Sequence, residues 1–355
     1  MKVFHCDNCR NLVFFENVHC GKCQRPVAFL PDTGVMASLT PVDDTIWLSE
    51  HPSAQSKRYR LCHNYSNFNI CNWAVPEEDD NPLCASCRLT RVIPDLGQPG
   101  NMESWYKMEA AKRRLIYSLF NLQLPLHAKT GEAPGLAYEF KANVPETDAE
   151  AVLTGHDAGL ITINIAEADD AEREKRRLNM HEPYRTLLGH FRHEIGHYYW
   201  DVLVRDSARL EAYRDMFGDE TSDYAHALKR HYEQGPPPNW QNSFVSAYAT
   251  SHPWEDWAET WAHYLHMTDG LETAAACGLT LRPLNADEPE LQGTGSGIRQ
   301  RRFNSMISDW FALAYALNNL NRSMGLMDAY PFVLSEPVIA KLRFVHETIH
   351  AAMRL

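Results

Sequence analysis

The most informative part of the chain is Phe191-Arg192-His193-Glu194-Ile195-Gly196-His197-Tyr198-Tyr199-Trp200. His193 and His197 are four residues apart, so on a helix they lie one turn apart on the same face and can reach one metal ion. Glu194 lies close enough to act on a water molecule at that ion. Residues 184–204 contain no proline and space their apolar side chains for a helix. The sequence therefore predicts a metal site on a helix over residues 184–204.

The pattern H-E-x-x-H carries two zinc-binding imidazoles and a carboxylate general base in zinc peptidases, and it occurs twice in this chain. The second match is His346-Glu347-Thr348-Ile349-His350. A catalytic zinc ion needs a third protein ligand beside an open position for water. Residues 351–355 contain no His, Asp, Glu or Cys that could supply this ligand. We therefore interpret the second match as an ordinary amphipathic helix whose His and Glu are surface or interhelical groups.

A source for the third ligand lies downstream of the first match, in Trp254-Glu255-Asp256-Trp257-Ala258-Glu259-Thr260-Trp261-Ala262-His263-Tyr264. This sequence predicts a second helix in which Trp257, Trp261 and Tyr264 face a core. Glu255 and Glu259 share one face, so one carboxylate can bind the metal while the other accepts a hydrogen bond from a ligating imidazole. The alternative is a solvated helix face, the usual place for carboxylates. The H-E-x-x-H helix favours the ligand interpretation.

The two helices resemble those of the gluzincin group of metallopeptidases, which includes thermolysin and anthrax lethal factor. In that group the third zinc ligand is a Glu on a helix downstream of H-E-x-x-H, and an acidic residue four positions later supports a ligating histidine. The sequence Glu255-Asp256-Trp257-Ala258-Glu259-Thr260-Trp261 is similar to the lethal-factor form of that helix. In this form a tyrosine seven residues before the ligand lines the site, and that position is Tyr248 here.

The resemblance implies a role for each matching position. It implies that His193, His197 and Glu255 bind zinc. It implies that Glu194 is the general base and that Tyr248 contacts the oxyanion. Glu259 is implied to support a ligating histidine. His263 is a further histidine near the site, which we expect to support it or to contact the oxyanion. The alternative for Tyr248 is an ordinary aromatic residue of a loop.

Nine cysteines give a second metal signal, and four of them form two C-x-x-C pairs: Cys6, Cys9, Cys20 and Cys23. Two thiolates on each of two tight turns predict a closed, tetrahedral zinc site. A disulfide framework is the alternative. The sequence begins Met1-Lys2-Val3-Phe4 without an apolar signal segment, so we expect a reducing, cytoplasmic location in which zinc is favoured over disulfides.

Four more cysteines predict a second structural zinc site with less regular spacing: Cys62, Cys71, Cys84 and Cys87. The last two form a good C-x-x-C turn, whereas the interval between the first two is irregular. His63 could therefore replace a cysteine as ligand. Cys277 is left over and is predicted to be a small buried apolar residue.

The charge balance and the lack of long apolar runs argue against nucleic-acid and membrane partners. The net charge of the chain is −12, and residues 1–100 contain nine Lys and Arg against eleven Asp and Glu. A protein that binds nucleic acid by bulk electrostatics needs the opposite balance, so we expect no nucleic-acid partner. No run of about 18 apolar residues is present, so we expect no membrane span. The cysteine-rich region is expected to contact a protein partner or to be purely structural.

The sequence divides into two predicted domains of an α+β protein. Residues 1–97 predict a β-rich zinc-ribbon region with strands at 12–15, 27–30 and 45–48. Residues 94–101 are rich in turn formers, and residues 98–355 predict a mostly helical, zincin-like domain with a small sheet. Its predicted helices and strands include 103–122, 208–216, 221–234, 303–320 and 336–353, and 136–141 and 160–165. By analogy with the gluzincin fold, strand 160–165 is expected at the sheet edge that pairs with an extended substrate.

The whole chain resembles a bacterial family of zinc-binding metallopeptidases that carry an N-terminal zinc ribbon. The resemblance rests on the first cysteine set, on the two site helices, and on Asp328-Ala329-Tyr330-Pro331-Phe332-Val333-Leu334. It implies hydrolysis of peptide or protein substrates by a zinc-activated water. Two alternatives stay open: a non-catalytic adaptor that binds a partner through its ribbon, and a DNA-associated protease of the SprT-like kind. The intact ligand set argues against the first, and the missing basic surface argues against the second.

Overall fold

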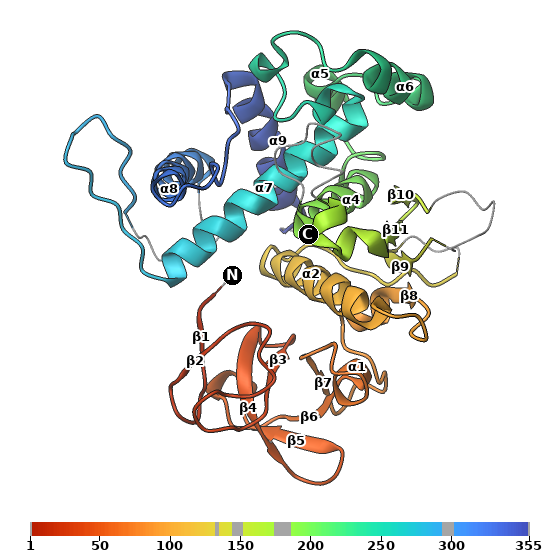
Figure 1. Ribbon diagram of the computed structural model, residues 1–355, viewed down its shortest axis with the longest axis vertical. Coiled ribbons are helices and arrows are strands. Elements are labelled where there is room, and N and C mark those ends of the chain that lie inside the picture. Colours follow the sequence, from red (N-terminus) through yellow and green to blue (C-terminus); the bar gives the residue numbers. More distant parts are fainter. Residues whose placement is uncertain (1, 132–134, 144–151, 174–185, 293–301, 354–355) are drawn as a thin grey trace. The chain divides into compact units, whose positions relative to one another are not determined.

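The computed structural model describes residues 2–131, 135–143, 152–173, 186–292 and 302–353 (Figure 1). The chain forms two compact units. The N-terminal unit comprises Lys2–Asn121 and Leu126–Asp169, and the C-terminal unit comprises Leu122–Pro125 and Asp170–Leu355. The first is rich in sheet and the second is mostly helical, so the predicted α+β class is confirmed.

The first half of the N-terminal unit is built from short antiparallel strands. A two-stranded sheet joins β1 (Phe4–His5) and β2 (Leu12–Val13). A five-stranded sheet has the order β3-β4-β5-β6-β7, with the bounds Val27–Leu30, Val35–Pro41, Ile46–Ser49, Arg58–Leu61 and Ala74–Pro76. The strands predicted at 12–15, 27–30 and 45–48 correspond to β2, β3 and β5. Short helical turns connect these elements: η1 (Pro52–Ala54), α1 (His63–Ser66) and η2 (Cys87–Leu89).

The second sheet of this unit has four strands in the order β10-β11-β9-β8, with the bounds Gly155–Asp157, Leu160–Asn164, Ala137–Lys141 and Thr90–Val92. β11 pairs in parallel with β9 and antiparallel with β10. The prediction that strand 160–165 is a free sheet edge is therefore wrong. The reason is the tight turn at Ala158-Gly159, where both residues have positive φ and fold β10 back onto β11.

Helix α2 (Asn101–Asn121) belongs to the same compact unit as the cysteine-rich sheets. Its Tyr117 ring lies 5.3 Å from Phe15 and 5.8 Å from Phe29, and Phe29 lies 4.7 Å from Trp73. These buried rings form an aromatic core, which dominates the energetics of a small unit. The turn η3 (Ile165–Ala168) also packs on α2. A domain boundary at residue 97 stays a prediction.

The described part of the C-terminal unit is helical. Its helices are α4 (Leu187–Leu203), α5 (Leu210–Phe217), α6 (Tyr224–Gln234), α7 (Pro253–Ala276), α8 (Phe303–Ser323) and α9 (Glu336–Ala352), with the turns η4 (Trp240–Asn242) and η5 (Tyr248–Thr250). The predicted helix 103–122 corresponds to α2 of the N-terminal unit, and the other predicted helices correspond to those of this unit. Residues 184 and 185 lie outside the described residues, and α7 is much longer than 254–264. No helix in the described ranges combines the length and the apolar character that crossing a bilayer requires.

The close packing of α4 against α7 explains the glycine inside the first H-E-x-x-H match. Figure 1 shows the two helices side by side. A Cβ atom on Gly196 would lie 3.0 Å from Cα of Ala258 and 3.2 Å from Cβ of Trp261. The carbonyl oxygen of Gly196 also accepts a hydrogen bond of 2.9 Å from Nε1 of Trp257. Only glycine lets the backbones approach this closely, so Gly196 sets the distance between the ligand-bearing helices.

The second H-E-x-x-H match lies on α9 and is an interhelical contact, as interpreted from the sequence. His346 is buried, and its Nδ1 lies 3.0 Å from the Tyr264 hydroxyl of α7. Within the described ranges no Asp, Glu or Cys joins His346 and His350 in a ligand group. Cys277 is exposed at the C-terminus of α7, so the prediction that it is buried is wrong. The helix ends there, and the residue therefore has no core to enter.

Candidate metal centres

Two imidazoles and one carboxylate converge between α4 and α7. Nε2 of His193 and Nε2 of His197 lie 3.2 Å apart. Oε2 of Glu255 lies 3.0 Å from the first and 3.5 Å from the second. All three side chains are buried, with exposed fractions of 8%, 3% and 1%. The three residues that the sequence placed at one metal ion therefore do lie together.

The donor set at this point fits a zinc ion. Glu255 Oε2 is buried and has no partner with hydrogen-bond geometry in the described residues, although two imidazole nitrogens face it. Burial lowers the pKa of His193, but the contacts with Glu255 and Glu259 outweigh it and hold the pKa well above its usual value. The group therefore attracts positive charge. Two His nitrogens and one carboxylate oxygen match a catalytic zinc site with an open position.

Glu259, one turn beyond Glu255 on α7, holds the His193 ring in place. Its Oε1 lies 2.7 Å from Nδ1 of His193, and its Oε2 accepts a hydrogen bond of 2.6 Å from the Ser246 hydroxyl. Burial raises the pKa of Glu259, but the hydrogen bond with His193 lowers it to about 2. Because Glu259 stays ionised, it accepts a hydrogen bond from the Nδ1–H of His193, and the neutral tautomer with this proton presents the lone pair of Nε2 to the metal position.

Glu194 and Tyr248 lie beside the ligands. Glu194 follows His193 on α4 and is 6% exposed. The Tyr248 ring, on η5, lies 5.8 Å from the His193 ring. Burial, together with the charge of Glu255, raises the pKa of the Tyr248 hydroxyl well above its usual value. The hydroxyl therefore keeps its proton and can donate a hydrogen bond.

His263 lies behind the site. Its Nδ1 is 2.7 Å from the Tyr330 hydroxyl, and its ring packs on Phe332 at 4.4 Å. Both partners belong to the segment 328–334 that the sequence singled out. Burial lowers the pKa of His263 to about 4, although the charge of Glu259 opposes this. His263 is therefore a neutral packing residue that links α7 to that segment.

Three residues at the site had no signal in the sequence. The Tyr224 hydroxyl donates a hydrogen bond of 2.7 Å to Oε1 of Glu255, Ser246 binds Glu259, and the Trp254 ring lies 3.9 Å from the His197 ring. Tyr224 and Ser246 lie outside both site helices, in segments without a motif. Trp254 directly precedes Glu255, but no motif gives it a role at the site.

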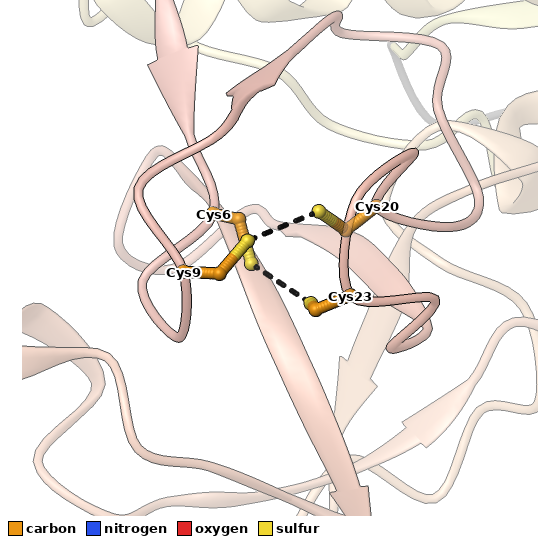
Figure 2. A group of neighbouring side chains, drawn as sticks. All are labelled: Cys6, Cys9, Cys20 and Cys23. Atoms are coloured by element: carbon orange, nitrogen blue, oxygen red, sulfur yellow. Dashed lines mark hydrogen bonds between the residues drawn. The ribbon is translucent and has the colours of Figure 1, made fainter.

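The four cysteines of the first set lie together, with their sulfur atoms within 4.8 Å of one another (Figure 2). Sγ of Cys6 lies 3.7 Å from Sγ of Cys23, and Sγ of Cys9 lies 3.5 Å from Sγ of Cys20. A disulfide requires about 2.05 Å. Four sulfurs at about 2.3 Å from a central zinc ion would lie about 3.8 Å from one another. The spacing therefore fits zinc, and all nine cysteines are free thiols.

The local backbone prepares this first set for metal binding. Hydrogen bonding by the backbone N–H of Arg25 lowers the pKa of the Cys23 thiol to about 6. Burial raises the pKa of the Cys6 thiol to about 12. The cysteine turn that ends with Cys23 therefore supplies a thiolate readily, whereas Cys6 needs the cation to become one.

The second cysteine set is fully buried, and its ligand atoms lie within 4.8 Å of one another. Sγ of Cys71 lies 3.8 Å from Sγ of Cys84. His63 is exposed, and its Nδ1 lies 2.8 Å from Asn67 Nδ2, so the alternative in which His63 replaces a cysteine is wrong. The buried Arg113 of α2 donates a hydrogen bond of 2.7 Å to the Ile70 carbonyl beside this set.

The fold and the three ligand groups define a zinc-binding protein with two closed cysteine sites and one open histidine–carboxylate site. The chain belongs to the family described as "Putative zinc-binding metallo-peptidase", whose model matches residues 101–348. A zinc-ribbon domain matches residues 3–98. Together these matches confirm the family and the zinc ribbon that the sequence motifs indicated.

The chain is also similar to uncharacterised proteins of Mycobacterium tuberculosis and Mycobacterium bovis. Each is 43% identical over 351 residues, which cover 98% of this chain and 95% of the relative. No solved structure matches the chain. The relatives therefore place the chain in its family along nearly its whole length, and they name no substrate.

Proposed function

We propose that this protein hydrolyses peptide bonds with a zinc ion held by His193, His197 and Glu255. The observation that supports this most is the convergence of two imidazole nitrogens and one carboxylate oxygen within 3.5 Å of one another. The buried carboxylate of Glu194 follows His193 on the same helix. The eight grouped cysteines hold structural zinc and take no part in the chemistry, because four thiolates leave no open position.

Each residue has a distinct task in the proposed reaction. A zinc ion held by His193, His197 and Glu255 would act as a Lewis acid and would lower the pKa of water at this site from ~16 toward ~7. Glu194 accepts the proton of the attacking water and returns it to the leaving amine. The protonated Tyr248 hydroxyl donates a hydrogen bond to the oxyanion that develops on the peptide carbonyl. Glu259 orients His193 throughout.

The substitution Glu194→Gln tests the proposal, because it removes the base and keeps the size of the side chain. We expect native mass spectrometry to find three zinc ions in both proteins. Hydrolysis of casein or of a peptide library should fall by about 100-fold or more. Glu347→Gln is a matched control, since it makes the same change in the other H-E-x-x-H sequence, at an exposed position. Full activity in Glu194→Gln would overturn the mechanism.

The same assays separate the alternatives. A non-catalytic adaptor would show no hydrolysis in the wild type and would give the same result for both Gln variants. A DNA-associated protease would bind duplex DNA with an affinity that falls steeply with salt. Nothing in the described residues favours either of these over hydrolysis of a peptide or protein substrate.

A further inference from the structure

Tyr224 contacts one oxygen of the Glu255 carboxylate, and the imidazoles of His193 and His197 face the other oxygen. The Tyr224 hydroxyl donates a hydrogen bond of 2.7 Å to Oε1 of Glu255. Oε2 of the same carboxylate faces His193 Nε2 at 3.0 Å and His197 Nε2 at 3.5 Å. One oxygen therefore points into the metal position and the other is occupied by a side chain that comes from a different helix.

The place of Tyr224 is fixed by several contacts at the start of α6. Asp223 caps this helix by accepting a hydrogen bond of 3.0 Å from the backbone of His226. The Tyr224 ring packs on His252 at 5.1 Å and on Trp254 at 5.9 Å. His252 in turn caps α7, because its Nδ1 accepts from the Trp254 N–H at 3.1 Å. The first turns of α6 and α7 are thus held together at Glu255.

A second contact holds α6 two turns further on. Nδ1 of His231 lies 3.3 Å from the Thr250 hydroxyl, and its ring lies 5.9 Å from the Tyr248 ring. Tyr224 and His231 are seven residues apart, so they lie on the same face of α6. Through Tyr224 and His231 this face meets the metal site and η5, although the Tyr224 side chain is itself 38% exposed. The helix therefore delivers the Tyr224 hydroxyl to a defined point.

The chemistry of the two groups suits a lasting hydrogen bond. The phenol O–H of Tyr224 donates to a carboxylate oxygen, Oε1 of Glu255, over 2.7 Å. A hydrogen bond to an ionised acceptor is among the stronger ones in proteins.

We propose that Tyr224 is a positioning residue that occupies Oε1 of Glu255 and limits this ligand to one oxygen at the zinc ion. A carboxylate can offer a metal one oxygen or both. A second oxygen at the zinc ion would compete with the open position that hydrolysis needs. Tyr224 thereby preserves that position without touching the ion. The inference rests on the proposed function for the ligand set, and it concerns coordination rather than hydrolysis itself.

Cobalt substitution of the histidine site tests this directly. In the wild type and in Tyr224→Phe, a chelator first removes the ion at the histidine site, and Co²⁺ is then added in its place. Metal counting confirms that the eight cysteines keep their zinc. The absence of sulfur-to-cobalt absorption confirms that no cobalt has entered the cysteine sites. The visible bands of Co²⁺ weaken as its coordination number rises, so we expect weaker bands in Tyr224→Phe. Equal spectra in the two proteins would overturn the proposal.

Tyr232→Phe is the matched control, because it removes a hydroxyl from an exposed tyrosine on the same helix. Its cobalt spectrum should equal that of the wild type. Phenylalanine keeps the ring that packs on His252 and Trp254, and far-ultraviolet circular dichroism verifies the fold of each variant. Loss of the ion from Tyr224→Phe, in a folded protein, would contradict a role limited to positioning.

Kinetics separate this inference from the proposed function. In an active wild type, Tyr224→Phe should lower kcat by about 10- to 100-fold with a smaller change in KM, the range found for residues that orient metal ligands. If the wild type hydrolyses nothing but the spectra differ as expected, the positioning role stands and the proposed function fails. If activity falls while the spectra are equal, Tyr224 acts in another way and the inference is wrong.

Discussion

Oε1 of Glu259 lies 2.7 Å from Nδ1 of His193, on the side of the ring opposite the metal position. This carboxylate fixes which imidazole nitrogen carries the proton, and the Ser246 hydroxyl fixes the carboxylate at 2.6 Å. The metal ligand is therefore held by a chain of two hydrogen bonds that joins α4, α7 and the segment before η5.

Replacing Glu259 should weaken metal binding. In Glu259→Gln a neutral amide replaces the charged acceptor of the hydrogen bond from Nδ1–H of His193. We therefore expect the zinc affinity of the histidine site to fall by about 10- to 100-fold. Competition with a chromogenic chelator measures this. The exposed Glu233→Gln should bind zinc as the wild type does. An unchanged affinity in Glu259→Gln would show that packing alone orients His193.

Gly196→Ala should destabilise the C-terminal unit. The added methyl group would press on Ala258 and Trp261 at 3.0–3.2 Å, and helix backbones cannot yield freely. Overpacking of this kind costs about 1–3 kcal/mol, which outweighs the gain of about 1 kcal/mol in helix propensity. Thermal unfolding followed by circular dichroism should show a lower Tm. Gly155→Ala, whose Cβ meets nothing within 4 Å, should leave Tm nearly unchanged.

The metal ligands could be predicted from the sequence because local geometry determines them. The spacing of His193 and His197 means one face of a helix wherever that helix lies, and each C-x-x-C pair means two thiols on one turn. Glu255 needed a further helix, and the acidic residue one turn later supplied the signal. Their grouping in the structure also needs the close packing of α4 against α7, which Gly196 permits.

The remaining features depend on contacts that no local pattern records. Tyr224 is the first residue of an exposed helix, and only the packing of that helix brings its hydroxyl to Glu255. The order of strands in the four-stranded sheet depends on a tight turn at Ala158 that puts β10 outside β11. His63 follows a ligand cysteine but points to Asn67, because it begins a short helix.

Arg113→Met should release zinc from the second cysteine set. Four thiolates around Zn²⁺ carry 2 − 4 = −2, and the buried Glu109 beside Cys87 adds a further negative charge. Arg113 and Lys112, both buried, are the cations that offset it in the described residues around this set. Without the guanidinium a buried negative charge is left uncompensated, which costs about 3–5 kcal/mol. Zinc counting after mild chelation should find one ion fewer.

Arg114→Met is the neighbouring control for this prediction. Arg114 is partly exposed and pairs with Glu16 at 2.6 Å, away from the cysteines. Exposed pairs contribute about 0–1 kcal/mol, so this variant should keep all three ions. If both variants lost zinc equally, the effect would come from α2 as a whole and not from the charge of Arg113.

His346 should make stability depend on pH in a defined direction. Burial, together with His350 and Arg343, lowers the pKa of His346 to about 4, below the ordinary value of 6.5. Between these values the unfolded chain binds more protons than the folded chain, so this group stabilises the fold above pH 6.5, and the contribution is lost as pH falls toward 4.

In His346→Gln this contribution is absent. Thermal unfolding between pH 7 and pH 4 should therefore show a smaller fall in Tm for His346→Gln than for the wild type, whereas the exposed His226→Gln should follow the wild type. Parallel Tm curves for wild type and His346→Gln would mean that His346 titrates alike in the folded and unfolded chains, and that its contact with Tyr264 does not depend on the neutral imidazole.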